Sequence, residues 1–117
     1  MKINRSFGYA FNGLVLALKG QLSLRIHIFI VLVVVMAGFY FHISAFEWIL
    51  CLIMVALVIS LELMNTAIEN LTDLATKEQS PLAGKVKDIA AGAVLFSSVV
   101  AFIVGLLIFT KYLFANH

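Results

Sequence analysis

The sequence has few charged residues, one cysteine and one proline. Only 12% of the 117 residues are charged, against about 25% in soluble domains, while 63% are apolar. This balance excludes a disordered chain and disfavours a soluble globule. A single cysteine, Cys51, provides neither an internal disulfide nor a cysteine-based zinc site. A net charge of +2 without a basic run argues against a nucleic-acid partner. The length fits one domain at most. These absences leave a small integral membrane protein.

Three long apolar stretches, at residues 28–41, 46–61 and 89–109, predict three membrane-spanning helices. A spanning helix needs about 20 mostly apolar residues, and only the third stretch is that long by itself. We therefore expect the first two helices to extend into polar sequence, which gives spans at about residues 24–43, 46–74 and 86–112. Residues 42–45 are predicted to be a tight turn and residues 75–86 a loop, in which Ser80-Pro81 is typical of a helix start.

Residues 3–20 predict a helix of another kind. Phe7, Phe11, Leu14 and Leu18 recur at helical spacing and so share one face. We expect an amphipathic helix that lies in the membrane interface with this face toward lipid. A signal peptide is disfavoured, because a second hydrophobic span follows at once.

The distribution of basic residues predicts an orientation in the membrane. Seven of the eight lysines and arginines lie before or at the start of the first span, or between the second span and the start of the third, and only Lys111 lies at the C-terminal end of the third. Loops rich in lysine and arginine stay in the cytoplasm. The N-terminus and the second loop are therefore expected to face the cytoplasm, and the C-terminus to lie outside.

The end of the second span carries polar side chains on one helical face. At about 100° per residue, Asn65, Glu69 and Asp73 all lie within about 60° of Glu62 around the helix. Ionisable groups at membrane depth are costly and usually functional. Carboxylates one helical turn apart also repel each other unless a positive charge sits between them. This polar face therefore indicates a site for a divalent cation or for lysine side chains.

The start of the third span supplies such lysines. Lys85, Lys87 and Asp88 are expected beside the polar face if the two helices pack antiparallel. Carboxylates that hold Mg²⁺, a lysine that contacts phosphates and a carboxylate that accepts a hydroxyl proton are the parts of a phosphoryl-transfer site. A solvated helix end is the alternative for Asp73, but it explains Glu62 poorly, since apolar residues flank that carboxylate.

Two further polar residues receive simpler interpretations. His27, near Arg25, is expected to anchor its helix in the interface rather than to bind a ligand. Glu47, beside the tight turn, is expected to be solvated.

Several segments resemble the prokaryotic diacylglycerol kinase family, which includes the undecaprenol kinases. They are Glu62-x-x-Asn65-Thr66-Ala67-Ile68-Glu69-x-x-x-Asp73, Lys87-Asp88-Ile89-Ala90-Ala91-Gly92-Ala93, Tyr9-Ala10-Phe11-x-Gly13 and Arg25-Ile26-His27. The resemblance covers nearly the whole chain. It implies an all-α membrane protein of the bacterial cytoplasmic membrane, with an amphipathic surface helix, three transmembrane helices and a homotrimeric assembly. Active sites are then expected between protomers, with ATP as co-substrate and Mg²⁺ as cofactor.

The resemblance also implies roles for individual residues. Glu62 matches a general base, and Asn65 matches a residue that positions phosphate and acceptor. Glu69 matches a metal ligand, and Lys87 matches a lysine that contacts phosphates, with Asp88 as its polar neighbour. The nucleotide-binding set is Lys2, Tyr9, Gly13, Glu69, Asp73, Lys87 and Asp88. Two positions depart from the pattern. Gln21 stands where the family usually has a glutamate as second metal ligand, and a neutral side chain supplies no charge. Ser80 stands before Pro81, where the undecaprenol kinase branch often has a histidine.

From these features we expect a lipid kinase that transfers the γ-phosphate of ATP to a membrane lipid alcohol. Undecaprenol is favoured as the acceptor over diacylglycerol, because the sequence around His27, Asn65 and Ala90 resembles the undecaprenol kinase branch. The main alternative is a degenerate family member that binds nucleotide or lipid without turnover, and Gln21 supports it. An ion or proton transporter fits less well, since the third span has few polar residues midway.

Overall fold

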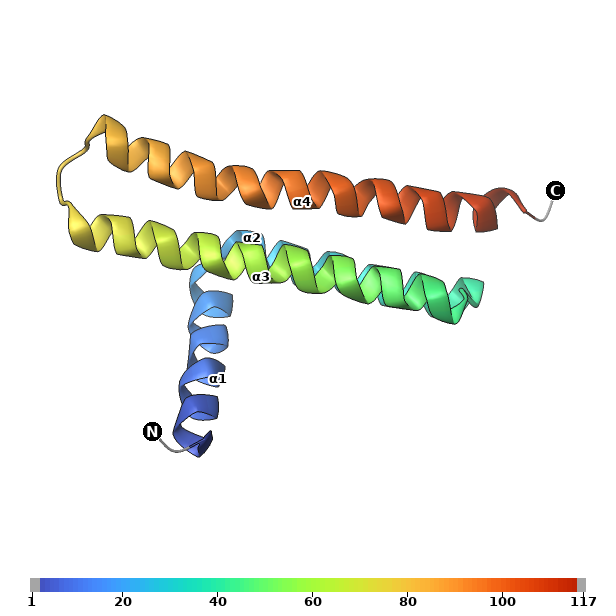
Figure 1. Cartoon of the computed structure of the whole chain (residues 1–117). Coiled ribbons are helices and arrows are strands. Elements are labelled where there is room, and N and C mark those ends of the chain that lie inside the picture. The colour runs from blue at the N-terminus through green and yellow to red at the C-terminus, as the bar shows by residue number, and fades with distance from the viewer. Residues whose placement is uncertain (1–2, 116–117) are drawn as a thin grey trace.

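The chain folds into four helices, seen in a computed structural model that describes residues 3–115. They are α1 (Ile3–Gly20), α2 (Leu22–Phe41), α3 (Ala45–Ala75) and α4 (Pro81–Phe114). Helices α2, α3 and α4 are each long and apolar enough to cross a membrane, which confirms the three predicted spans. Figure 1 shows these three helices side by side, with successive helices antiparallel, while α1 leaves the bundle crosswise.

The three spanning helices differ in length. The 20 residues of α2 extend about 30 Å, which matches the hydrocarbon core of a bilayer. The 31 residues of α3 and the 34 of α4 extend about 46 and 51 Å. Because α2 and α3 meet at the tight turn, α3 continues well past the start of α2 toward the α3–α4 loop (Figure 1). This overhang of α3 and α4 carries the part of the polar face beyond Glu62.

The loop between α3 and α4 is shorter than predicted, because residues 81–86 are helical. Ser80 is the N-cap of α4, and its hydroxyl accepts the Ala83 N–H at 3.1 Å. Pro81 occupies the first turn, where a missing N–H breaks no helical hydrogen bond. Lys85 and Lys87 therefore sit on a rigid helix rather than in or beside a loop.

The turn between α2 and α3 brings the two helices into close contact. His42 ends α2 in the left-handed conformation, with φ at 54°, and its N–H donates to the Gly38 carbonyl. This ends α2 at Phe41, two residues before the predicted boundary. A Cβ on Gly38 would lie 2.6 Å from the ring of Trp48. Glycine at this position is therefore what allows the indole to pack directly on α2.

Glu47 is buried at the start of α3, contrary to the expectation that it is solvated. The residue is only 5% exposed. It closes a capping box, in which Glu47 accepts the Ser44 N–H at 2.9 Å and Ser44 Oγ accepts the Glu47 N–H at 3.2 Å. From the far end of α4, Tyr112 donates its hydroxyl to Glu47 and Lys111 pairs with it. Glu47 thus joins the start of α3 to the end of α4.

The apolar core of the single chain is small and lies near this same end. Ile43, Cys51 and Ile108 form its buried centre, with Phe41 and Phe109 packed against it. Most other large apolar side chains of the bundle are exposed. Outward-facing apolar side chains suit helices whose surroundings are lipid or other spanning helices rather than water.

We expect Gly38→Ala to destabilise the fold by about 1–3 kcal/mol, because the added methyl overpacks the contact with Trp48. The measurement is the free energy of unfolding in detergent. Gly105→Ala is the matched control, since a Cβ at Gly105 meets nothing within 4 Å and alanine favours a helix. Equal unfolding free energies for the two variants would contradict this account of the turn.

Candidate active site

Glu62 is the most buried carboxylate of the polar face. Its residue is 4% exposed, and it lies on α3 level with the first turns of α2. Ser23 Oγ donates to Glu62 Oε1 at 2.9 Å, and His27 Nε2 lies 3.6 Å from Oε2. An ionisable group that is held out of water by a fold is a candidate for acid–base chemistry.

Asn65 and Glu69 come next along the same helical face. Asn65 Nδ2 donates to Glu69 Oε1 at 3.0 Å, which holds the carboxylate against its own helix. The other atom of that amide, Asn65 Oδ1, is buried and has no hydrogen-bond partner within the described residues. A buried carbonyl oxygen without a partner costs free energy, so it points to a ligand that the chain itself does not supply.

Asp73 and Lys87 form the last element of the polar face, next to the loop. Lys87 Nζ lies 2.5 Å from Asp73 Oδ1, and the two side chains are 38% and 66% exposed. Antiparallel packing of α3 and α4 therefore brings a lysine to the carboxylates, as the sequence predicts. A cleft of about 400 Å³ opens between this pair and loop residues that include Lys77 and Ser80.

These three groups lie at different depths along α3. At 1.5 Å per residue, Glu69 lies about 10 Å and Asp73 about 16 Å beyond Glu62 along the helix axis. Glu62 is therefore level with α2, whereas the other two carboxylates lie on the overhang. The polar face thus connects a buried carboxylate to an exposed, charged cleft.

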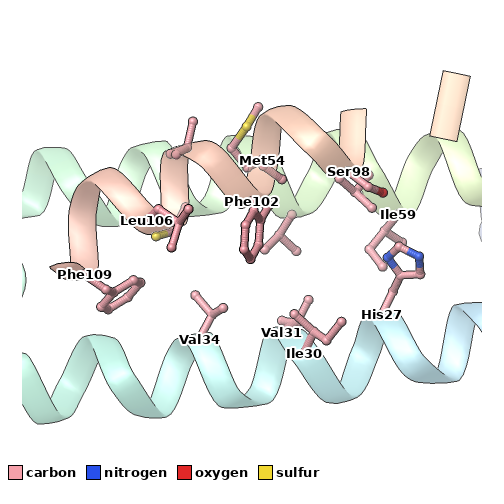
Figure 2. Close-up of a pocket in the computed structure, with 16 residues that line it drawn as sticks. His27, Ile30, Val31, Val34, Met54, Ile59, Ser98, Phe102, Leu106 and Phe109 are labelled. Carbon is pink, nitrogen blue, oxygen red and sulfur yellow. The ribbon is translucent and has the colours of Figure 1, made fainter. Parts of the chain in front are cut away.

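An apolar groove reaches toward Glu62 from the other direction. It has a volume of about 370 Å³ and lies among α2, α3 and α4. Figure 2 shows His27, Ile59 and Ser98 toward one end of the groove and Phe109 at the other. Ser98 Oγ is buried there without a partner among the described residues. Since His27 also faces Glu62, the polar end of the groove adjoins that carboxylate.

Several predicted site residues are not gathered on this face. Tyr9 is 64% exposed on α1, and Gly13, also on α1, is exposed. Gln21 is the half-buried N-cap of α2, and its side chain makes no capping bond. Asp88 is exposed on α4. Lys2 lies outside the described residues. The roles of all five stay predictions.

Sequence reasoning missed two residues beside Glu62. It did not single out Ser23, and it assigned His27 only to anchoring, whereas the structure places both against the carboxylate. A signal was present: the two polar residues stand one turn apart near the start of a mostly apolar helix. Such spacing places them on one face, but it does not say which neighbouring helix that face meets.

The oxygen ligands at Glu69 suit a magnesium ion that binds together with a nucleotide. Within residues 3–115, no three histidine, cysteine or acidic side chains lie close enough to form a metal cage. Mg²⁺ that accompanies a nucleotide needs only one or two carboxylates, because phosphates and waters complete its coordination. Glu69 offers one carboxylate, and the unpartnered Asn65 Oδ1 offers a neutral oxygen beside it. These residues suit an ion that arrives with phosphates.

The fold and its polar face define a small multi-pass membrane protein with an ionisable site at one end of its spanning helices. The family described as prokaryotic diacylglycerol kinase matches residues 8–109. The chain therefore belongs to the prokaryotic diacylglycerol kinase family.

Individual relatives agree with this assignment. The chain is 38% identical over 105 residues to an undecaprenol kinase of Bacillus subtilis (strain 168). The aligned region covers 90% of this chain and 85% of that protein. It is 40% identical over 101 residues to a diacylglycerol kinase of Synechocystis, covering 86% and 58% of the two chains. It is 31% identical over 102 residues to a diacylglycerol kinase of Escherichia coli (strain K12), covering 87% and 84%.

We expect Glu62→Leu to leave the unfolding free energy in detergent unchanged within about 1 kcal/mol, or to raise it. The reason is that an apolar side chain removes the penalty of a buried carboxylate. Val58→Ala, at a buried position one turn earlier on α3, should lower stability by about 1 kcal/mol or more and serves as the control. A larger loss for Glu62→Leu than for Val58→Ala would assign Glu62 to the architecture instead.

Proposed function

We propose that this chain is a membrane lipid kinase that transfers the γ-phosphate of ATP to the hydroxyl of a membrane lipid alcohol. The observation that carries the proposal is the position of Glu62, between an apolar groove on one side and the charged overhang of α3 and α4 on the other. A lipid and a water-soluble nucleotide can meet only at such a boundary. The relatives named undecaprenol kinase and diacylglycerol kinase support the same activity.

In this mechanism Glu62 removes the proton of the lipid hydroxyl as the oxygen attacks the γ-phosphorus. Phosphoryl transfer depends mainly on positioning and on neutralising charge around the phosphates. Lys87 supplies positive charge on the overhang, and Asp88 lies beside it on α4. When bound, Mg²⁺ would neutralise phosphate charge, and Glu69 with Asn65 would hold it.

The lining of the groove supports undecaprenol as the acceptor over diacylglycerol. Its walls are apolar apart from His27 and Ser98 near one end and Cys51 further along. A polyprenol is a hydrocarbon that ends in a single hydroxyl, so it needs no other polar partner. A diacylglycerol carries two ester groups next to its hydroxyl, and these lose hydrogen bonds to water in an apolar groove.

The assembly we propose is a homotrimer, with the N-terminus in the cytoplasm and the C-terminus outside. The exposed apolar surfaces of the bundle and the family resemblance support an oligomer. An amphipathic α1 in the interface would then carry Tyr9 and Gly13 to a nucleotide site completed by a second copy. The excess of basic residues in α1, at the start of α2, in the α3–α4 loop and at the start of α4 supports the orientation.

The catalytically inactive alternative rests on Gln21, and the mechanism above does not require a glutamate there. One carboxylate at Glu69 together with phosphate oxygens meets what Mg²⁺ demands of a protein. The relatives matched along most of their length are named kinases, so an active enzyme is the better-supported proposal.

The test of the proposal is phosphate transfer from labelled ATP to undecaprenol or diacylglycerol in mixed micelles with Mg²⁺. We expect the chain to label undecaprenol, and Glu62→Gln to lower kcat by about 10²-fold or more, because an amide accepts no proton. As a control for folding, the unfolding free energy of Glu62→Gln in detergent should equal that of the original chain, so that a lower kcat reports lost chemistry. Nucleotide binding without label in either lipid would favour the inactive alternative, and an unimpaired Glu62→Gln would refute the mechanism.

We expect Gln21→Glu to lower the Mg²⁺ concentration for half-maximal activity by about threefold to tenfold, since a second carboxylate would join Glu69. Titration of activity with Mg²⁺ at constant ATP measures this. Asn4→Asp adds the same charge on α1 away from the α1–α2 junction and should leave the titration unchanged. A Gln21→Glu titration that coincides with that of the original chain would remove position 21 from the metal site.

A further inference from the structure

The two oxygens of the Glu62 carboxylate have different surroundings. Oε1 accepts a hydrogen bond of 2.9 Å from Ser23 Oγ, and Oε2 lies 3.6 Å from His27 Nε2. Ser23 and His27 stand one turn apart on α2 and face the same carboxylate. Each oxygen of the carboxylate therefore has its own polar neighbour on α2.

Ser23 fixes the orientation of the carboxylate. Thr66, by contrast, donates to the backbone carbonyl of Glu62, whereas the Ser23 hydroxyl donates to the carboxylate itself. Because Oε1 already accepts the serine hydrogen, Oε2 is the oxygen that stays free to take a proton. The hydrogen bond thus selects one of two otherwise equivalent oxygens as the base.

The distance between His27 Nε2 and Glu62 Oε2 leaves room for a hydroxyl group that contacts both atoms. A separation of 3.6 Å is too long for a direct hydrogen bond. It does allow a hydroxyl oxygen to lie about 2.8 Å from both atoms. Such a hydroxyl would donate its hydrogen to Glu62 Oε2 and accept the N–H of His27 Nε2.

The groove indicates what carries that hydroxyl. His27 lines the polar end of the apolar groove, and the walls beyond it are mostly hydrocarbon. A ligand that fills the groove and ends between His27 and Glu62 is therefore a hydrocarbon chain with a terminal hydroxyl. The nucleotide has no comparable apolar part.

We propose that Ser23 and His27 prepare Glu62 for the lipid alcohol: Ser23 is a positioning residue that fixes Oε1, and His27 binds the acceptor oxygen beside Oε2. The inference rests on the proposed function. In the step it describes, the acceptor oxygen forms a bond to the γ-phosphorus, the bond between that phosphorus and the β–γ bridging oxygen of ATP breaks, and the hydroxyl proton passes to Oε2. His27 keeps its hydrogen and orients the attacking lone pair.

The experiment compares steady-state kinetics of the full chain and its variants in mixed micelles, with undecaprenol and ATP varied separately. His27→Leu should lower kcat/KM for the lipid by about tenfold or more, with KM for ATP within about twofold. His27→Gln, which retains an N–H donor, should recover part of this loss. Ser23→Ala should lower kcat by about tenfold with both KM values within about twofold, and Ser23→Thr should restore it.

Two matched controls remove the same chemical groups elsewhere. Ser97→Ala deletes a buried hydroxyl that bonds only to the Val94 carbonyl. His42→Asn replaces a histidine at the left-handed turn with a residue that tolerates that conformation. Both should keep the kinetic constants of the original chain.

The outcomes separate this inference from the proposed function. If the original chain phosphorylates no lipid alcohol, the proposed function fails. If it does so while His27→Leu and Ser23→Ala keep its kinetic constants, only the inference fails. A loss that raises KM for ATP as much as KM for the lipid, or that Ser23→Thr and His27→Gln do not relieve, would assign the two residues to the architecture and overturn the inference as well.

Discussion

A carboxylate that is held out of water at the end of a membrane-spanning segment is the constraint on which the arrangement of this protein depends. A carboxylate at such a depth needs hydrogen-bond partners from the protein, because water does not supply them there. Ser23 and His27 come to it from the first turns of α2. Helices α2 and α3 therefore meet through polar contacts at this end, and through the packing of Trp48 on Gly38 at the other end.

The unequal lengths of the helices place further polar side chains beyond Glu62. Helix α2 is about as long as the hydrocarbon core is thick, whereas α3 and α4 extend well beyond it. The extra turns carry Asn65, Glu69, Asp73 and Lys87 away from the apolar groove. A single helical face thus passes from an environment suited to a lipid to one suited to phosphates, and Glu62 lies at the change.

At the opposite end of the bundle, the buried carboxylate of Glu47 links two helices. Glu47 combines a helix cap with contacts to Tyr112 and Lys111, so it fixes the start of α3 to the end of α4. The aromatic and aliphatic side chains of the small core pack near the same level. With α3 and α4 in contact there and joined by a short loop at the other end, the backbones that carry Asp73 and Lys87 lie opposite each other.

The sequence by itself determined the class of protein, the three spans and the polar face of α3. Each of these depends on hydrophobic length or on helical periodicity, which are properties of a single segment. The meeting of Lys87 with Asp73 also followed, since a short connection forces antiparallel packing. The tertiary structure alone decided that Glu47 is buried and that Ser23 and His27 face Glu62. These features depend on which side of one helix meets which side of another, and that rotation is set by the packing of side chains across three helices rather than by any one segment.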